Sequence, residues 1–243
     1  AIMGGPILIA FAGDNNNFKD LYILSAYFLI PIFLLMIFSL KTKRGAEVYF
    51  RVSLPFRVWN ELKNVRRVTL ARTVLEFFFA IMVIYMPIYL HKIVGFSWEQ
   101  IGIIFTFVLL PFVLFEWPAG ELADKKYGEK EIMFSGFVIL CLSVLIMPYL
   151  GSSIVIWAIA LFVSRIGASL IEITTDSYFF KQIGPHHVGL ISIFRLSRPF
   201  GLMLGAGIGA LSNALLHSSS IFLILGVTIL FGIRQSFFLV DTK

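Results

Sequence analysis

The sequence contains a single cysteine, Cys141, and only 14% of its 243 residues are charged. One cysteine excludes an intramolecular disulfide and a cysteine-based metal cluster. Catalytic motifs are missing as well, since there is no His-Glu-x-x-His, no Gly-x-Ser-x-Gly and no glycine-rich phosphate loop. The adjacent His186 and His187 follow Pro185 and are typical of a loop. We therefore expect no enzyme, no metal and no cofactor.

Apolar residues are abundant instead. Hydrophobic residues make up 58% of the chain, 26 residues are phenylalanine, and the mean hydropathy is +0.90. Soluble domains are less apolar and carry about a quarter of charged residues, so the composition predicts an integral membrane protein. The net charge of +6 does not indicate nucleic-acid binding, because the basic residues cluster in loops.

Long apolar runs predict where the chain crosses the membrane. Residues 1–12 are too short for a crossing, which needs roughly 20 residues, and we expect the second half of a truncated helix. Residues 21–40 form a complete span. Six further spans follow, at 68–90, 99–119, 130–149, 153–180, 188–212 and 218–238. The sequence therefore predicts an all-α polytopic membrane protein of about seven transmembrane helices, with one incomplete helix at the start.

The hydrophilic section 41–67 divides the chain. It holds eight Lys or Arg residues against two Glu, and it forms either an interfacial amphipathic helix or a solvated basic loop. With this section inside, the inner loops hold fourteen basic residues and the outer ones only Lys19 and Lys92. By the positive-inside rule, we expect the linker, the 120–131 loop and the C-terminus to be cytoplasmic. We also expect the membrane to be the plasma membrane.

Ionisable residues inside or near the ends of the spans are the main functional signal. Each costs about 2.5–3.5 kcal/mol at a helix centre, so they must face protein or water. There are eight of them: Arg72, Glu76, Glu116, Arg165, Glu172, Asp176, Arg195 and Arg198. Helical spacing places all of them except Glu116, with nearby hydroxyl residues, on polar stripes of three spans. Such stripes indicate a water-accessible cavity. Its substrate or proton-coupling candidates are Glu76, Arg165, Glu172, Arg195, Thr73 and Ser169.

Two interpretations stay open for these charges. Arg165 and Glu172 lie deep enough to contact a solute or a proton, or they form a buried pair that only holds helices together. Glu76 has the same two options, with an i,i+4 pair to Arg72 as the structural one. Glu116 and Asp176 lie near the cytoplasmic surface. We expect these two as structural partners of Lys125 or Lys126.

The segment 115–130 joins two apolar runs through a short charged loop. Its residues Gly120, Leu122, Ala123, Asp124 and Lys125, followed by Gly128 and Lys130, match a known pattern. The loop resembles the G-x-L-A-D-R/K-x-G-R/K-R/K motif of the major facilitator superfamily. This copy has one extra residue between Asp124 and Gly128, and Glu129 stands where the motif has a base.

The resemblance implies a partial twelve-helix fold. Residues 1–40 would be the end of the N-terminal bundle, 41–67 the central cytoplasmic linker, and 68–243 the C-terminal six-helix bundle. The N-terminal half of the same chain would then be missing. The function implied is a secondary active transporter that moves a small solute by alternating access in the lipid bilayer.

A proton-coupled version would protonate Glu76 or Glu172 and thereby alter their pairing with Arg165 or Arg195. In the loop, Asp124, Lys125 and Lys126 would clasp neighbouring helix ends while the cytoplasmic side is closed. Two other classes stay open, a non-transporting membrane scaffold or assembly protein and a membrane-embedded enzyme.

Overall fold

The structure is a computed structural model that describes residues 62–122, 128–183, 188–215 and 220–240, together with Trp59 and positions 27, 29–31 and 33–35. Within these residues every regular element is helical, as the hydropathy pattern predicts. The elements are α4 Lys63–Tyr89, the π-helical turn η1 Leu90–Val94, α5 Trp98–Val108, α6 Leu110–Leu122, α7 Glu129–Ile146, the 3-10 turn η3 Met147–Tyr149, α8 Ile154–Gln182, α9 Val188–Leu215 and α10 Ser220–Phe237.

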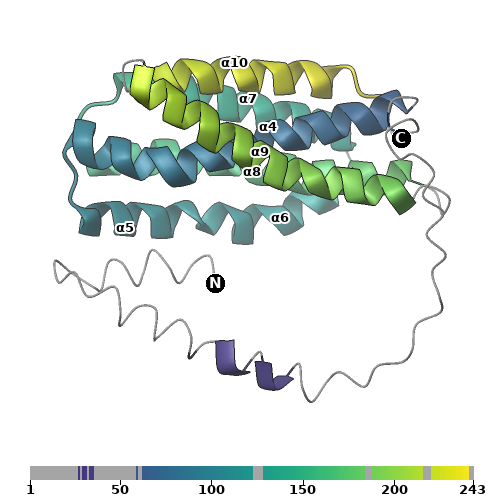
Figure 1. The fold of residues 1–243 in the computed structure, drawn as a ribbon, viewed down its shortest axis with the longest axis horizontal. Coiled ribbons are helices and arrows are strands. Elements are labelled where there is room, and N and C mark those ends of the chain that lie inside the picture. Colours follow the sequence, from purple (N-terminus) through teal and green to yellow (C-terminus); the bar gives the residue numbers. More distant parts are fainter. Residues whose placement is uncertain are drawn as a thin grey trace.

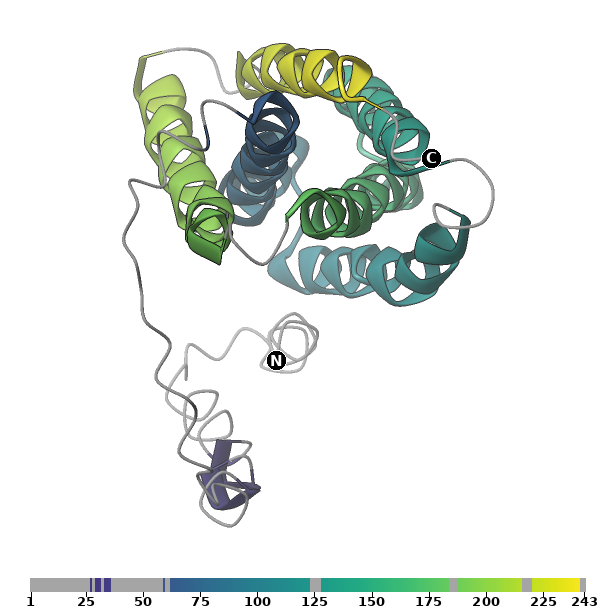
Figure 2. The ribbon, with the colours of Figure 1, turned by 90° about the vertical axis from the view of Figure 1, so that its right-hand side faces the viewer.

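The helices form one bundle with two inner members, α4 and α8. Helix α4 packs against α9, α10 and α8, whereas α8 packs against α7, α6, α5 and α4. Figures 1 and 2 show α9 at one edge of the bundle, beside α4. Large side chains such as Trp157, Tyr178, Phe78 and Phe137 are fully buried between the helices. The fold is that of an all-α polytopic membrane protein.

Five helical segments in the described part of the chain are long and apolar enough to cross a membrane: Lys63–Val94, Trp98–Phe115, Glu129–Tyr149, Ile154–Gln182 and Ser220–Phe237. Helix α9 is also long, but it carries Arg195 and Arg198 and is not among them. Helix α9 packs along α4, but both arginines are exposed, and Arg198 lies close to Glu76 of α4.

Two element boundaries differ from the sequence prediction. Helix α4 begins at Lys63, so the helix extends into the stretch assigned to the linker. The span predicted at 99–119 is broken at Leu109 into α5 and α6. Pro111 accounts for the break, because proline has no N–H for the helical hydrogen bond and its ring crowds the carbonyl one turn earlier.

Local signals in the sequence fix the turn between α4 and α5. After η1, Gly95 adopts the left-handed conformation with φ 89°, which glycine tolerates best. Ser97 then caps α5: its hydroxyl accepts a hydrogen bond from the Gln100 N–H at 3.3 Å, and the Gln100 side chain accepts from the Ser97 N–H at 3.0 Å. This reciprocal capping box defines where α5 starts.

Glycines allow the closest helix contacts. A Cβ added to Gly201 would lie 2.7 Å from the Glu76 Cβ, and one added to Gly205 would lie 2.5 Å from the Ala80 Cβ. The spacing of glycines on the predicted 188–212 span indicates such an approach, and the structure confirms it. Helices α4 and α9 therefore touch backbone to backbone at the level of Glu76.

Candidate functional site

Arg72 on α4 is the centre of an ion-pair cluster that joins three helices. Its guanidinium donates to the carboxylates of Glu76, 2.9 Å away on the same helix, and of Glu172, 2.9 Å away on α8. A third contact, of 3.2 Å, goes to Asp176. Arg72 is only 7% exposed, so these carboxylates replace the water that a guanidinium would otherwise bind.

Glu76 extends the cluster to α9. Its second carboxylate oxygen lies 3.9 Å from the Nε of Arg198, in the longest of these ion pairs. Glu76 is 2% exposed, while the Arg198 side chain is 64% exposed. We call Arg72, Glu76, Glu172, Asp176 and Arg198 the Arg72 cluster. It contains three carboxylates and two guanidiniums, so one negative charge is in excess when all five groups are ionised.

The cluster contains one of the two options that the sequence left open for Glu76, together with pairs that were not expected. Arg72 and Glu76 form the i,i+4 ion pair. Glu172 and Asp176 bind Arg72. Lys125 and Lys126, the expected partners of Asp176, lie outside the described residues. From the sequence, Glu76 was the partner considered for Arg72. Nothing in the sequence shows that α4 and α8 face each other at the level of Arg72.

Arg165, a second buried cation, stands apart from the cluster. It is 4% exposed, and its guanidinium lies 5.3 Å from the ring centres of both Phe78 and Phe79 on α4. Its Nε has no hydrogen-bond partner in the described parts of the chain. Cation–π contacts with these two rings and the electrostatic attraction of Glu172 on the same helix stabilise its charge.

The other polar candidates separate into lining and buried residues. Thr73 lines a groove of 510 Å³ between α4 and α9, with Thr69, Leu70, Ile193, Leu196, Ser197, Pro199, Phe200, Met203 and Trp59. Ser169 is fully buried, and its hydroxyl donates to the Ile166 carbonyl at 2.9 Å. Arg195 is exposed on α9. Of the predicted stripes, only that of α4 borders this groove.

The loop candidates are described in part. Gly120, near the end of α6, lies close to α8. A Cβ added to Gly120 would lie 3.8 Å from the Ile173 side chain. Gly128 precedes α7 with φ 84° and is buried, which explains a glycine at this position. The Lys130 ammonium lies 6.0 Å from the ring centre of Phe237. Asp124, Lys125 and Lys126 lie outside the described residues, and so does the side chain of Glu116.

Glu129 gives a physical reason for one departure from the loop motif. Its carboxylate pairs with Lys181 near the end of α8 and accepts a hydrogen bond from the Ser177 hydroxyl at 3.2 Å. Glu129 is buried at the first turn of α7, where a negative charge also suits the helix dipole. A base at this position would face Lys181 instead. Sequence spacing alone did not reveal this pair.

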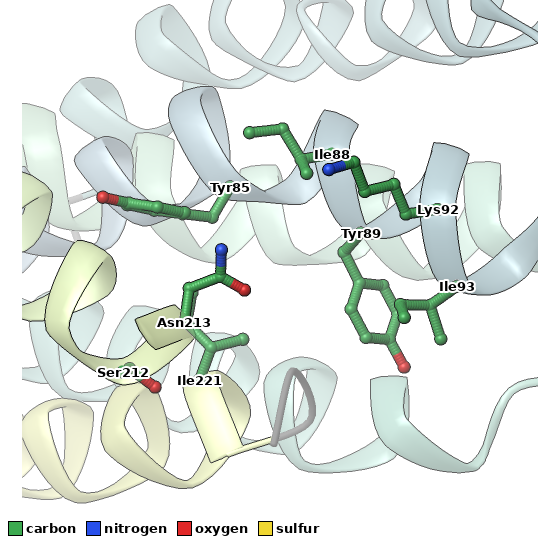
Figure 3. Close-up of a pocket in the computed structure, with 8 residues that line it drawn as sticks. All are labelled: Tyr85, Ile88, Tyr89, Lys92, Ile93, Ser212, Asn213 and Ile221. Atoms are coloured by element: carbon green, nitrogen blue, oxygen red, sulfur yellow. The ribbon is translucent and has the colours of Figure 1, made fainter. Parts of the chain in front are cut away.

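The α4 end opposite the Arg72 cluster borders a smaller cavity of 100 Å³. Figure 3 shows Tyr85, Tyr89 and Lys92 on its α4 side, with Ser212 and Asn213 from α9. Solute sites usually hold 300–1,000 Å³, so this space suits waters rather than a solute. Within the described residues no three metal-binding side chains gather into a metal site.

A sequence model of the Major Facilitator Superfamily matches residues 77–243, which include the second half of α4 and all the later described helices. No curated protein matches the chain. The match begins within one helix turn of Glu76 and covers Glu172, Asp176 and Arg198.

Proposed function

The chain belongs to the Major Facilitator Superfamily, a family of membrane transporters and not of enzymes, and on this premise we propose that it is a proton-coupled secondary transporter. In this proposal a small solute crosses the membrane by alternating access. The Arg72 cluster binds the proton. In this proposal the cytoplasmic side of the protein is the end of the bundle where Lys63 and Gln182 lie, because the basic loop residues are concentrated at that end.

The burial of Glu76 within the Arg72 cluster carries this proposal. Glu76 is 2% exposed, and its charge is balanced by Arg72 and by the more distant Arg198. Little water reaches this carboxylate, so its ionised form depends on these partners. The cluster holds three carboxylates and two guanidiniums, but the side chains of Asp176 and Arg198 are 45% and 64% exposed, and solvent screens part of this imbalance. Glu76 is therefore the group that we expect to take up and release the proton.

Glu76 links this proton to helix movement. While ionised it attracts Arg72 on its own helix and Arg198 on α9. A protonated Glu76 would keep one hydrogen bond to Arg72 but would lose most of its attraction for Arg198. Helix α9 would then be held to α4 by packing and by the hydrogen bond that the Tyr85 hydroxyl donates to the Ala206 carbonyl at 2.6 Å. A proton shifts a conformational equilibrium only if one state binds it better, and this ion pair supplies that difference.

Thiol accessibility tests the proposal without knowledge of the solute. In the full-length protein, free of other cysteines and reconstituted in proteoliposomes, Thr73→Cys reports on the α4–α9 groove. We expect its labelling by a membrane-impermeant maleimide to change between acidic and neutral pH. The same change should vanish in Glu76→Gln. Ser152→Cys, on an exposed turn before α8, is the matched control and should not respond in this way.

A static scaffold would behave differently. Its cluster would only hold helices together, so Thr73→Cys would label at one rate at both pH values once thiol reactivity is corrected with the Ser152→Cys control. A second measurement tests whether Glu172 takes part in proton coupling. It compares solute uptake driven by a pH gradient in Glu172→Gln with uptake by the unmodified protein. Unchanged proton coupling in that variant would remove Glu172 from the mechanism.

A further inference from the structure

The groove between α4 and α9 has walls that match one chemical class of solute. We infer that it binds an uncharged, largely apolar solute that carries at least one hydrogen-bond donor. This inference rests on the transport function proposed above and names its substrate class. The groove lies beside the Arg72 cluster. Gly201 of α9 packs against both Glu76, which belongs to the cluster, and Thr73, which lines the groove.

The walls contain no counter-ion. Among the described residues that line the groove, none is ionisable; most are aliphatic, aromatic or proline side chains. Arg198 is adjacent in sequence to the lining residues Ser197 and Pro199, but it is directed to Glu76. A charged solute moved from water into this groove would lose solvation without gaining a partner in the walls. This favours an uncharged solute.

The polar atoms of the walls are mainly acceptors. Thr69 donates its hydroxyl hydrogen to the Val65 carbonyl at 2.7 Å, and Thr73 donates to the Thr69 carbonyl at 2.9 Å. Ser197 on α9 donates to the Phe194 carbonyl at 2.5 Å. Each hydroxyl has one hydrogen and two lone pairs, so only lone pairs remain for a solute. A matching solute must donate.

Trp59 adds one donor of its own. It lines the groove, and its indole Nε1 is buried without a hydrogen-bond partner in the part of the chain that the structure describes. A buried N–H without a partner is costly, so an acceptor on the solute would gain from meeting it. The walls thus offer few polar contacts in total. Sugars and other polyols need many more, and they are excluded as matching solutes.

The size of the groove agrees with a small organic molecule. Its volume of 510 Å³ lies within the range of 300–1,000 Å³ typical of solute pockets. Leu196, Phe200 and Met203 give α9 an exposed apolar wall opposite the hydroxyls of α4. Burying this surface against an apolar solute supplies most of the binding free energy, and the hydroxyls select for a donor.

A fluorescent probe of this class tests the inference. N-phenyl-naphthylamine is uncharged, largely apolar and has one N–H group, and its emission rises in apolar surroundings. It is titrated into proteoliposomes of the full-length protein, and the signal of protein-free vesicles is subtracted. We expect saturable binding that is weakened at least about tenfold in Met203→Trp, because the larger ring fills the groove. Leu211→Trp, equally exposed on α9 but outside the groove, should bind as the unmodified protein does.

Competition identifies the class. We expect no displacement by methyl galactoside or inorganic phosphate, and weaker displacement by tetraphenylphosphonium than by unlabelled uncharged aromatic amines. Thr73→Val should weaken binding of the probe, since valine keeps the shape but offers no acceptor.

Three results would overturn the inference. The first is equal probe binding in Met203→Trp and Leu211→Trp, which would mean that other protein or lipid covers the groove. The second is stronger competition by tetraphenylphosphonium than by the uncharged aromatic amines. The third is displacement of the probe by methyl galactoside or inorganic phosphate. The proposed proton coupling fails separately. If Glu76→Gln leaves the pH response of Thr73→Cys intact while Met203→Trp abolishes probe binding, the groove stands and the coupling falls. If instead Glu76→Gln abolishes the pH response of Thr73→Cys while Met203→Trp leaves probe binding unchanged, the proposed coupling stands and the solute site in the groove is wrong.

Discussion

The guanidinium of Arg72 and the carboxylate of Glu172 are separated by 100 residues in sequence and by 2.9 Å in space. This contact ties the first helix of the bundle to its other inner helix, α8. Arg72 also holds Glu76 and Asp176, so one side chain organises the buried charges of two inner helices. Its removal would affect both at once.

We predict that Arg72→Gln destabilises the protein by about 3–5 kcal/mol, the usual cost of removing one partner from a buried ion pair. Glu76 is almost inaccessible and would keep only the distant Arg198. Thermal unfolding in detergent, followed by tryptophan fluorescence, measures the effect. Arg195→Gln on exposed α9 is the control and should change stability little. Equal melting temperatures for the two variants would contradict the central role of Arg72.

Helix packing gives a second prediction, with a control two residues away. Gly205→Ala places a Cβ 2.5 Å from the Ala80 Cβ and 2.9 Å from the Phe77 carbonyl oxygen, so α9 must move away from α4. We expect a loss of about 1–3 kcal/mol, as for other overpacked sites. Gly207→Ala meets nothing within 4 Å and should be neutral or slightly stabilising, since alanine favours helices. Chemical unfolding of both variants decides this, and equal losses would contradict it.

For Arg165 we predict that its charge adds little to stability. The charge is buried, and in the described residues it lies against the rings of Phe78 and Phe79 and is attracted by Glu172. Replacing a weakly compensated buried charge with an apolar side chain of similar length is often neutral or stabilising. Arg165→Met should therefore melt at the same temperature as the unmodified protein or higher. A lower melting temperature would show that the attraction of Glu172 outweighs the cost of burying the charge.

The start of α7 offers a matched pair of glutamates. Glu129 is buried against Lys181 and Ser177, while Glu131 lies exposed in the same helical turn. Glu129→Gln keeps the shape but removes the charge, and we expect a loss of about 1–3 kcal/mol, as for other buried hydrogen-bonded charges. Glu131→Gln should cost much less, although both changes remove a favourable charge from the helix N-terminus. Melting temperatures of the two variants provide the comparison.

Within the described residues the sequence predicted the helices well, because long apolar runs depend mainly on composition. The segment 1–12 and most of the span predicted at 21–40 lie outside those residues. The sequence missed the break at Leu109, although Pro111 was visible, since proline in a membrane span often bends a helix without ending it. For the site, Glu76 and Glu172 were correctly expected to lie among other charges. Arg72 was expected as an i,i+4 partner of Glu76 but not as the partner of Glu172, because the rotation of α4 against α8 is decided by packing across the whole bundle.

Arg165 shows the same limit from the opposite side. It shares a helical face with Glu172, and that spacing suggested a pair. Seven residues, however, separate two positions by roughly 10 Å along a helix, so Glu172 attracts Arg165 without a direct ion pair between them. The structure places it between two phenylalanine rings of α4. Face-sharing along one helix predicts depth and side, and it does not predict which groups touch.

The break between α5 and α6 has a mechanical consequence. A continuous helix resists bending through its ladder of hydrogen bonds, and at Leu109 that ladder is interrupted before Pro111. The interruption covers a single residue, and Trp98–Phe115 as a whole stays long and apolar enough to cross a membrane. Leu109 is therefore the point at which we expect this span to bend most easily.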